Sequence, residues 1–243
     1  MAPGTVVSEL APTGTLRVAI NYGNAVLAAR NAATGELSGV SVDLANELAR
    51  RLAAPVSFTG FNTAGKVVDA VKTGTLDLMF LAIDPLRANE IDYTDAYVLI
   101  EGAYVVRQAS PIRANAEVDR PGVRVVVGGG SAYDLFLTRE IKAAQIVRMP
   151  NSQAVIDAFV SQNLEVAAGV KQQLEADMKR VAGLRLLDGR FMEIRQAMGT
   201  PRGRAAGAQY LRGFVEEMKA SGFVAQALAR HRIEGAAVAP PVR

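Results

Sequence analysis

Short apolar runs and helix-like repeats alternate along this sequence, and that alternation constrains the fold more than any other feature. Leucines at positions 44, 48 and 52 recur every fourth residue, as on one face of a helix, and Pro55 ends that helix. The nearly all-apolar run 76–82 is typical of a strand covered on both faces. Alternating strands and helices indicate βαβ units and a mostly parallel sheet. The first series of expected strands is 16–20, 56–58 and 76–82, with helices from 40 and around 67–71.

A second series of the same kind begins after Gly122. Its glycine-rich turn, Gly128–Gly130, separates a strand from a helix, and Ser221-Gly222 separates two helices near the end of the chain. The expected strands are 123–127, 146–147, 165–168 and 184–186, and the expected helices begin at 131 or span 154–160, 172–180, 203–219 and 223–230. The second half of the chain therefore repeats the α/β pattern of the first.

Two extended segments, 98–107 and 192–198, separate the two series. Two chain crossings between two compact halves would make the second half an insertion in the first. We therefore predict an α/β fold of two lobes, in which lobe 1 is 1–102 plus 197–243 and lobe 2 is 103–196. Because ligands of α/β sheets gather at the carboxyl ends of the strands, two such lobes would form a cleft.

The composition argues against several function classes. The 243 residues carry 27 basic and 24 acidic side chains, a formal charge of +3, without a long basic run or interleaved aromatics, so no nucleic-acid partner is expected. Without cysteine there is no disulfide, thiol nucleophile or Cys-containing zinc site. The single histidine, His231, is expected at the surface, which leaves no basis for a Ser-His-Asp triad or a His-rich metal site.

No stretch of the sequence approaches the about 18 apolar residues of a membrane-spanning helix. The first residues, MAPGTVVSELAP, lack a basic segment followed by an apolar one, as an export signal would have. The chain is therefore either cytosolic or the product of removing an export signal, and these residues leave both readings open.

Arg87 and the loop Asn21–Asn24 are two places that could carry binding chemistry. Arg87 follows an apolar strand and Pro85, and an arginine can pair bidentately with a carboxylate in a cleft. The alternative is a surface arginine paired with Glu90. The loop Asn21–Asn24 follows the first strand and could line a cleft, although asparagine and glycine also make simple turns.

The third place is the segment Gly128–Ser131, between a strand and a helix. Glycines let the main chain approach a ligand, and N–H groups at a helix start attract an anion. The segment lacks the lysine and the spacing of a phosphate loop. Ser131 as helix cap and Asp134 as its partner also predict a capping box, which is compatible with ligand binding.

Several segments together resemble the family 3 extracellular solute-binding proteins, the polar amino-acid type of bacterial ABC importers. The resemblance extends from Gly14 to about Arg230. No single segment is decisive, but their order and spacing are specific. The segments that carry it are Thr15–Ala19, Gly35–Ala45, Gly74–Leu78, Ala82–Arg87 and Ile91–Tyr97.

The resemblance implies a type II periplasmic-binding-protein fold, in which two α/β lobes joined by a two-strand hinge hold a ligand between them. It implies a monomeric periplasmic protein whose export signal has been removed, without enzymatic activity, cofactor or metal. The implied partners are an amino acid or small carboxylate and the membrane subunits of an ABC transporter.

The resemblance also assigns ligand-binding residues. The arginine that binds the ligand carboxylate falls on Arg87, and the anion loop of the second lobe falls on Gly130, Ser131 and Ala132. The other positions in the implied site are Asn21, Asn24, Phe80, Ala82 and Val170.

The sequence departs from the family at several of these positions. Ala82 replaces a threonine, Phe80 replaces a glycine, and neither Gly169 nor Val170 is the acid that would pair with an α-ammonium. A buried ammonium without a carboxylate partner would be costly. We therefore expect a ligand with a carboxylate and a partly apolar body, and without a required α-amino group.

Three alternatives stay open at this point. Asn21, Asn24 or Glu165 could supply an amine site, and Lys171 could be a further anion contact. A lyase or dehydratase acting on a small acid could use Glu165 or Asp134 as its acid, because fold does not settle function. The chain could also be a ligand-sensing receptor domain of a longer membrane protein.

Overall fold

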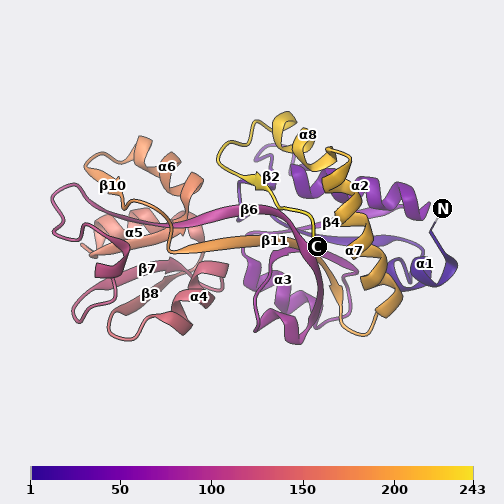
Figure 1. The fold of residues 1–243 in the computed structure, drawn as a ribbon, viewed down its shortest axis with the longest axis horizontal. Coiled ribbons are helices and arrows are strands. Elements are labelled where there is room, and N and C mark those ends of the chain that lie inside the picture. Colours follow the sequence, from indigo (N-terminus) through magenta and orange to yellow (C-terminus); the bar gives the residue numbers. More distant parts are fainter. Residues whose placement is uncertain (1, 243) are drawn as a thin grey trace. The chain divides into compact units, whose positions relative to one another are not determined.

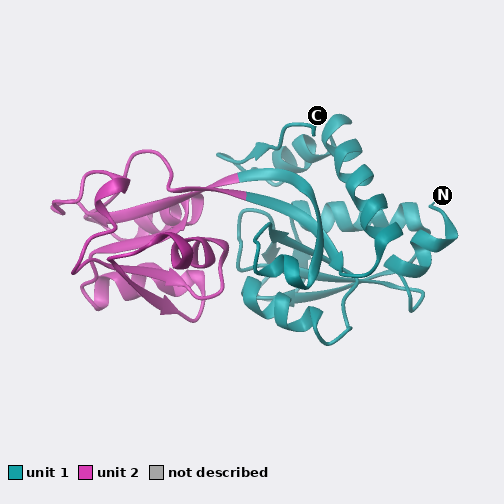
Figure 2. Ribbon diagram, turned by 60° about the horizontal axis from the view of Figure 1, so that its bottom comes forward, with its two compact units in different colours: residues 1–99, 195–243 teal, residues 100–194 magenta. Residues whose placement is uncertain are grey.

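The computed structural model describes residues 2–242, which form the two compact units coloured in Figure 2. Unit 1 contains the residues up to Leu99 and from Arg195 onward, and unit 2 is Ile100–Ile194. The chain enters unit 2 within β6 (Ile91–Arg107) and leaves it within β11 (Met192–Pro201). The sequence analysis placed these crossings after residues 102 and 196.

Unit 1 is built on three parallel strands in the order β4-β1-β5. Every residue of β5 is buried, as its apolar run predicts, and Met79 and Leu81 pack against Val67 and Val71 of α3. The strand β11 pairs with β5 in the antiparallel direction, so the sheet is mixed rather than purely parallel. The elements of this core are β1 (Leu16–Asn21), α2 (Val40–Leu52), β4 (Val56–Phe61), α3 (Ala64–Val71) and β5 (Leu78–Ala82).

Several short elements of unit 1 escaped the sequence analysis. The helix α1 (Gly4–Leu10) buries only Val6 and Leu10, too few residues to show a helical period. The strands β2 (Ala29–Arg30), β3 (Leu37–Ser38) and β12 (Ala237–Val238) are likewise too short to show the alternating pattern of a strand. By contrast, α7 (Ala205–Ala220) and α8 (Phe223–Arg230) are separated at Gly222, as predicted.

Unit 2 repeats the arrangement with three parallel strands in the order β8-β7-β9. Its core packs Val126 and Ala167 of the sheet against Phe159 and Leu174 of two helices. The strand β6 pairs antiparallel to β9, and β10 pairs antiparallel to β6, so this sheet is also mixed. The elements, all but β9 labelled in Figure 1, are β7 (Arg124–Gly128), α4 (Ala132–Glu140), β8 (Gln145–Met149), α5 (Val155–Ser161), β9 (Val166–Val170), α6 (Lys171–Arg180) and β10 (Leu184–Leu186).

Parallel strands bring their carboxyl ends to one edge of a sheet and their amino ends to the other. We call these the carboxyl edge and the amino edge of each unit. The carboxyl edge of unit 1 lies at Asn21, Phe61 and Ala82, and that of unit 2 lies at Gly128, Met149 and Val170. These two edges contain the loops that the sequence analysis selected.

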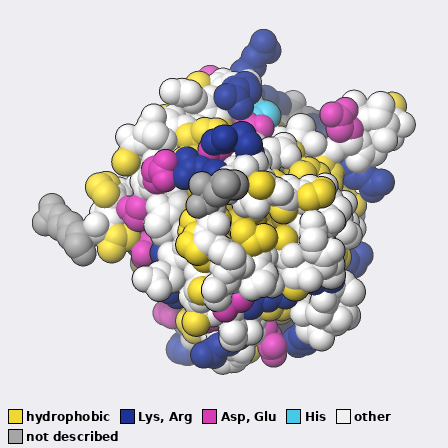
Figure 3. Space-filling model, turned by 90° about the vertical axis from the view of Figure 1, so that its right-hand side faces the viewer, with side chains coloured by type: hydrophobic (Ala, Val, Ile, Leu, Met, Phe, Trp, Pro, Cys, Tyr) yellow, Lys and Arg dark blue, Asp and Glu magenta, His cyan; other side chains and the backbone are white. Residues whose placement is uncertain are grey.

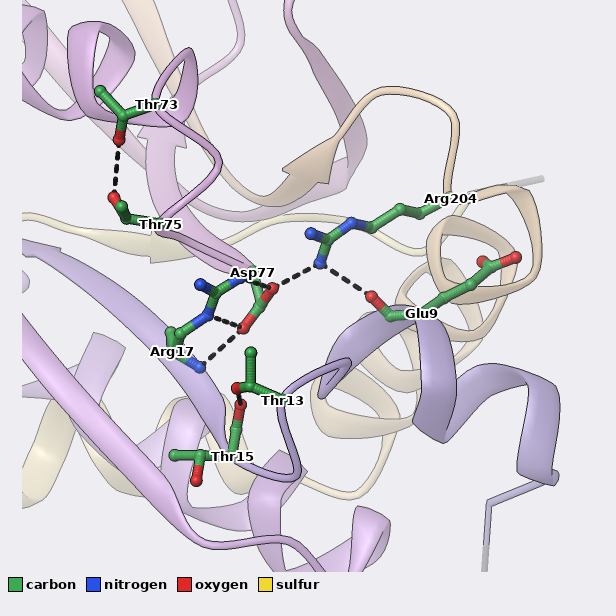
Figure 4. A network of polar contacts seen from close by, with 8 residues as sticks. All are labelled: Glu9, Thr13, Thr15, Arg17, Thr73, Thr75, Asp77 and Arg204. Atoms are coloured by element: carbon green, nitrogen blue, oxygen red, sulfur yellow. Dashed lines mark hydrogen bonds and ion pairs between the residues drawn. The ribbon is translucent and has the colours of Figure 1, made fainter.

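A buried carboxylate holds the amino edge of unit 1 together (Figure 4). Asp77, which is fully buried, accepts hydrogen bonds from the Arg17 guanidinium at 2.7 and 2.8 Å and from Arg204 Nη1 at 2.7 Å. Arg204 also donates to the main-chain oxygen of Glu9, at 2.8 Å. This network connects β1 and the residue before β5 with the start of α7 and the end of α1.

Charges on the surface are mixed in sign. On the face shown in Figure 3, basic and acidic side chains are interspersed around apolar ones, without a continuous basic area. This view agrees with the small formal charge of +3. None of the helices within residues 2–242 combines the length and the apolar character that a membrane crossing requires.

Candidate functional site

Arg87 lies just beyond the carboxyl end of β5, at the start of a short 3-10 helix, Arg87–Asn89. It is only 3% exposed, so the alternative of a surface arginine is wrong. Its Nη1 donates a hydrogen bond to the main-chain oxygen of Ala82, at 3.1 Å. Burial lowers the pKa of the guanidinium, while nearby Tyr93 and Asp84 favour its charged form. A guanidinium withdrawn from water in this way offers a preorganised planar fork of donors to a carboxylate.

Phe80 and Ala82 lie on the same face of β5, and both are buried. The Phe80 ring packs edge-on against Tyr97, with the ring centroids 6.1 Å apart. The Tyr97 hydroxyl lies 3.4 Å from the Ser41 hydroxyl. Phe80 therefore contributes its ring to the packing of unit 1, and Ala82 contributes its main-chain oxygen to Arg87.

The loop at Asn21–Asn24 forms a turn at the carboxyl edge of unit 1. The Asn21 side-chain oxygen accepts a hydrogen bond from Gly23 N–H at 3.1 Å, as in an Asx turn. Gly23 is required, because a Cβ there would collide with the main chain of Asn62. The Asn24 side-chain oxygen is buried and accepts no hydrogen bond. Asn21 therefore makes a turn, as one of the two interpretations predicted, while the side-chain oxygen of Asn24 could still accept a hydrogen bond.

The loop Gly130–Ala132 follows β7 at the carboxyl edge of unit 2, and we call it the 130–132 loop. Gly130 has a φ of 72°, in the region that favours glycine. Ser131 caps α4, and its Oγ accepts a hydrogen bond from Asp134 N–H at 3.1 Å. Asp134 Oδ2 in turn accepts a hydrogen bond from Gly130 N–H at 2.8 Å. The predicted capping is confirmed, with Gly130 rather than Ser131 donating to the acid.

Val170 ends β9 and lies opposite Gly102 of β6 in the strand register. The acid nearest to it in that register is Glu101, which is already paired with two cations. Glu101 lies 3.2 Å from Lys171 Nζ and 3.3 Å from Arg190 Nη1. Hydrogen bonds from Lys171 and Arg190 hold the pKa of Glu101 below its usual range, although burial opposes them.

Three other residues of the sequence analysis lie elsewhere or have protein partners. Glu165 precedes β9, at the amino edge of unit 2, where Arg124 binds it at 2.8 Å, so it is not beside Val170. Asp134 is paired with Arg148, at 2.9 Å. His231, expected at the surface, is partly buried, and its Nε2 lies 2.9 Å from Asp43 Oδ2 because α8 packs on α2.

The structure thus groups the predicted residues by unit. Arg87, Phe80, Ala82, Asn21 and Asn24 belong to the carboxyl edge of unit 1, with Arg87 and Ala82 in direct contact. The 130–132 loop and Val170 belong to the carboxyl edge of unit 2.

Sequence reasoning missed Tyr93, Glu101 and Arg148. The partners of Glu101 and Arg148 lie 70 and 14 residues away, at Lys171 and Asp134, where no local pattern links them. Only Tyr93 gave a signal, because it lies in one of the segments that carry the family resemblance. Within residues 2–242, no group of three or more His, Asp or Glu side chains is arranged to hold a metal ion.

Comparisons of structure find the same fold in amino-acid-binding proteins. The L-cysteine solute receptor of Neisseria gonorrhoeae matches with a TM-score of 0.80 and 22% identity, over 94% of this chain and 95% of that one. An ancestral amino acid-binding protein, a precursor of cyclohexadienyl dehydratase, matches with a TM-score of 0.77 and 20% identity, over 94% and 99%. An ancestral arginine-binding protein bound to glutamine matches with a TM-score of 0.75 and 20% identity, over 91% and 98%.

At these identities the structural matches establish the fold, so the predicted periplasmic-binding-protein fold is confirmed, with mixed sheets. A search of curated protein sequences finds no match. The sequence model of the bacterial extracellular solute-binding proteins, family 3, matches residues 16–232 of this chain. That span contains both carboxyl edges and both crossings, and the chain accordingly belongs to the bacterial extracellular solute-binding proteins of family 3.

Proposed function

We propose that this protein is the solute-binding component of a bacterial ABC importer and that it binds a small, amino-acid-like carboxylate in the periplasm. Its family consists of extracellular solute-binding proteins. The structural neighbours named above include a receptor for L-cysteine and a protein bound to glutamine, which supports this class of ligand. The partners are the ligand and the membrane subunits of the transporter, and the protein acts as a monomer without a cofactor.

The buried guanidinium of Arg87 is the observation that carries this proposal. It lies at the carboxyl end of a buried strand, where α/β sheets bind ligands, and one of its hydrogen bonds goes to the main-chain oxygen of Ala82. A ligand carboxylate would supply the charge-assisted, bidentate partner that this guanidinium suits. Phe80, Ala82, Asn21 and Asn24 would surround the ligand on the same edge.

The 130–132 loop would bind the same carboxylate from unit 2. Ser131 and Ala132 open the helix α4, where main-chain N–H groups and the helix dipole favour an anion. The lobes would follow the boundaries of the two units, and β6 and β11 would act as the hinge. Closure would be favoured because only the closed form makes both sets of contacts.

We further propose that the ligand does not need an α-amino group. Val170 is apolar, and the acids of the two carboxyl edges already have protein partners. Glu101 pairs with Lys171 and Arg190, Asp134 pairs with Arg148, and Asp84 accepts a hydrogen bond from Leu86 N–H at 2.8 Å. An ammonium buried there would lose its hydration without gaining a free carboxylate.

The first experiment is to release any small molecule from the purified protein under denaturing conditions and identify it by mass spectrometry. The refolded protein is then titrated with that compound and with two matched pairs, L-glutamine with glutaramate and L-cysteine with 3-mercaptopropionate, while thermal stability is recorded. We expect a released carboxylate, and stabilisation by the deaminated member of a pair at least equal to that by the amino acid. Sub-micromolar binding of the amino acids alone would refute the reading of Val170 and keep the binding function.

A lyase or dehydratase acting on a small acid is the alternative function, and the ancestral neighbour that preceded a dehydratase is the observation in its favour. The acids that such chemistry would use are ion-paired, Glu165 with Arg124 and Asp134 with Arg148. Mass spectrometry of each compound after incubation with the protein separates the two functions, because a binding protein returns it unchanged. A receptor domain would instead bind its ligand without stimulating a transporter.

A further inference from the structure

Asp134 places a negative charge beside the main-chain groups that the proposed function assigns to an anion. The carboxylate is buried, with 3% of the residue exposed, and its Oδ2 holds the N–H of Gly130 at 2.8 Å. Gly130, Ser131 and Ala132 are consecutive, so this charge lies within one turn of the anion contacts. Left unbalanced, it would repel a ligand carboxylate.

Arg148 both orients and neutralises this carboxylate. Its Nε lies 2.9 Å from Asp134 Oδ1 and 3.1 Å from Oδ2, so one N–H is shared between the two oxygens. Its Nη2 donates to Thr138 Oγ1 at 2.7 Å, and Thr138 Oγ1 lies 3.2 Å from Asp134 Oδ1. Arg148, Asp134 and Thr138 therefore form a closed ring of contacts around one carboxylate.

The strand β8 brings Arg148 to this place. Arg148 is paired in register with Val127 of β7, and the next pair along the strands is Gly128 with Met149. Gly129 N–H also donates to Met149 O, at 2.8 Å, so β8 supports the glycine turn directly. The guanidinium thus reaches Asp134 from the strand that lies beside the turn.

We propose that Arg148 is a positioning residue for ligand binding: it fixes and neutralises Asp134 so that the 130–132 loop can accept an anion. This inference rests on the proposed function for its binding consequence, but its structural consequence stands independently of any ligand. Without Arg148, the carboxylate would lose its orientation, release Gly130 N–H and present an uncompensated charge to the loop.

The test compares Arg148→Ala with Arg124→Ala. Arg124 is a matched control because it also pairs with an acid of unit 2, Glu165, but at the amino edge of the sheet. Amide hydrogen exchange is measured by NMR for Gly130 and for Val126, which lies within β7. In Arg148→Ala we expect Gly130 to exchange about tenfold faster while Val126 stays protected, and in Arg124→Ala we expect no change at Gly130.

The binding arm uses the amino acids and deaminated acids of the matched pairs above. We expect Arg148→Ala to weaken the tightest of these about fivefold, and Arg124→Ala to leave it unchanged. In an Asp134→Asn background, which removes the charge, Arg148→Ala should have little further effect on affinity, which a purely structural role would not predict.

The outcomes separate this inference from the proposed function. Unchanged exchange at Gly130 in Arg148→Ala would overturn the positioning role, and faster exchange with unchanged affinity would overturn its part in binding. If none of the four compounds binds the wild-type protein, the proposed function fails for this ligand class, and the exchange result alone decides whether Arg148 holds the loop.

Discussion

In unit 1, Arg17 of β1 binds Asp77, which precedes β5; in unit 2, Arg124 of β7 binds Glu165, which precedes β9. The two contacts are built alike. In each, the arginine main-chain N–H and Nε donate to one carboxylate oxygen and Nη2 donates to the other. The donor–acceptor distances of these hydrogen bonds lie between 2.7 and 3.1 Å. We call these two contacts the amino-edge clamps.

The clamps differ in burial. Asp77 is fully buried and also binds Arg204, whereas the Glu165 side chain is 34% exposed and, within residues 2–242, its clamp has no second arginine. Removing one member of a buried ion pair is strongly destabilising, because it leaves the other charge buried without a partner. An exposed ion pair contributes little to the free energy of unfolding. The same arrangement of atoms should therefore support the fold strongly in unit 1 and weakly in unit 2.

The largest expected effect is that of Asp77→Ala, which leaves Arg17 and Arg204 without their carboxylate. Removing one member of a buried ionic network costs about 3–5 kcal/mol in the free energy of unfolding. Urea unfolding of the wild type and the variant measures this directly. A loss similar to that of the corresponding change in unit 2, Glu165→Ala, would break the comparison.

The pH dependence provides a control for this result. Burial alone would raise the pKa of Asp77, but the hydrogen bonds from Arg17 and Arg204 hold it below its ordinary value. A pKa lowered by folding contributes stability above the unfolded-state value of about 3.9, and this contribution is lost as the pH falls toward the folded-state value. In Asp77→Asn, the loss of stability below about pH 4 should be correspondingly smaller than in the wild type.

The second largest effect concerns the opposite edge of unit 1 and is measured as affinity. Arg87→Ala should weaken binding of the released ligand about thirtyfold or more, because losing one partner of a desolvated charge pair costs at least about 2 kcal/mol. Isothermal titration provides the measurement. Arg107→Ala is the control, since Arg107 also donates to a main-chain oxygen, that of Leu164, away from both carboxyl edges. Near-wild-type affinity in Arg87→Ala would contradict its assignment.

The contrast between clamp and binding edge also explains what the sequence could predict. The leucine repeat of α2 and the apolar run of β5 predicted their elements because burial imposes a period on the sequence. The resemblance to the family identified Arg87 as a ligand-binding residue, but the sequence did not predict that Arg87 is buried. Contacts such as Arg17 with Asp77 or Arg148 with Asp134 escaped because ion pairs leave no period, and their partners are set by strand order and register.

A gain of binding would sharpen the proposal for the carboxyl edge of unit 2. Val170→Asp would place a carboxylate at the end of β9, where the acids of the carboxyl edge are otherwise engaged. A hydrogen bond between charged groups contributes about 1.5–3 kcal/mol, so L-glutamine should bind about tenfold more tightly while glutaramate should not. Val170→Asn, which has a similar shape without the charge, controls for packing. Equal changes for both compounds would mean that Val170 does not face the α-carbon of the ligand.

The smallest effect is expected for the exposed clamp. Arg124 donates to Glu165 and also to the main-chain oxygen of Asn163, at 2.8 Å, so it keeps an acceptor when the carboxylate is removed. The hydrogen bonds from Arg124 lower the pKa of Glu165, but water screens a pair that is this exposed. Glu165→Ala should therefore lower the urea midpoint by at most about a quarter of the Asp77→Ala effect. Raising the salt concentration should reduce this small difference further while leaving the effect of Asp77→Ala nearly intact, because salt does not reach a buried network. Equal salt sensitivity of the two variants would show that burial does not distinguish the clamps.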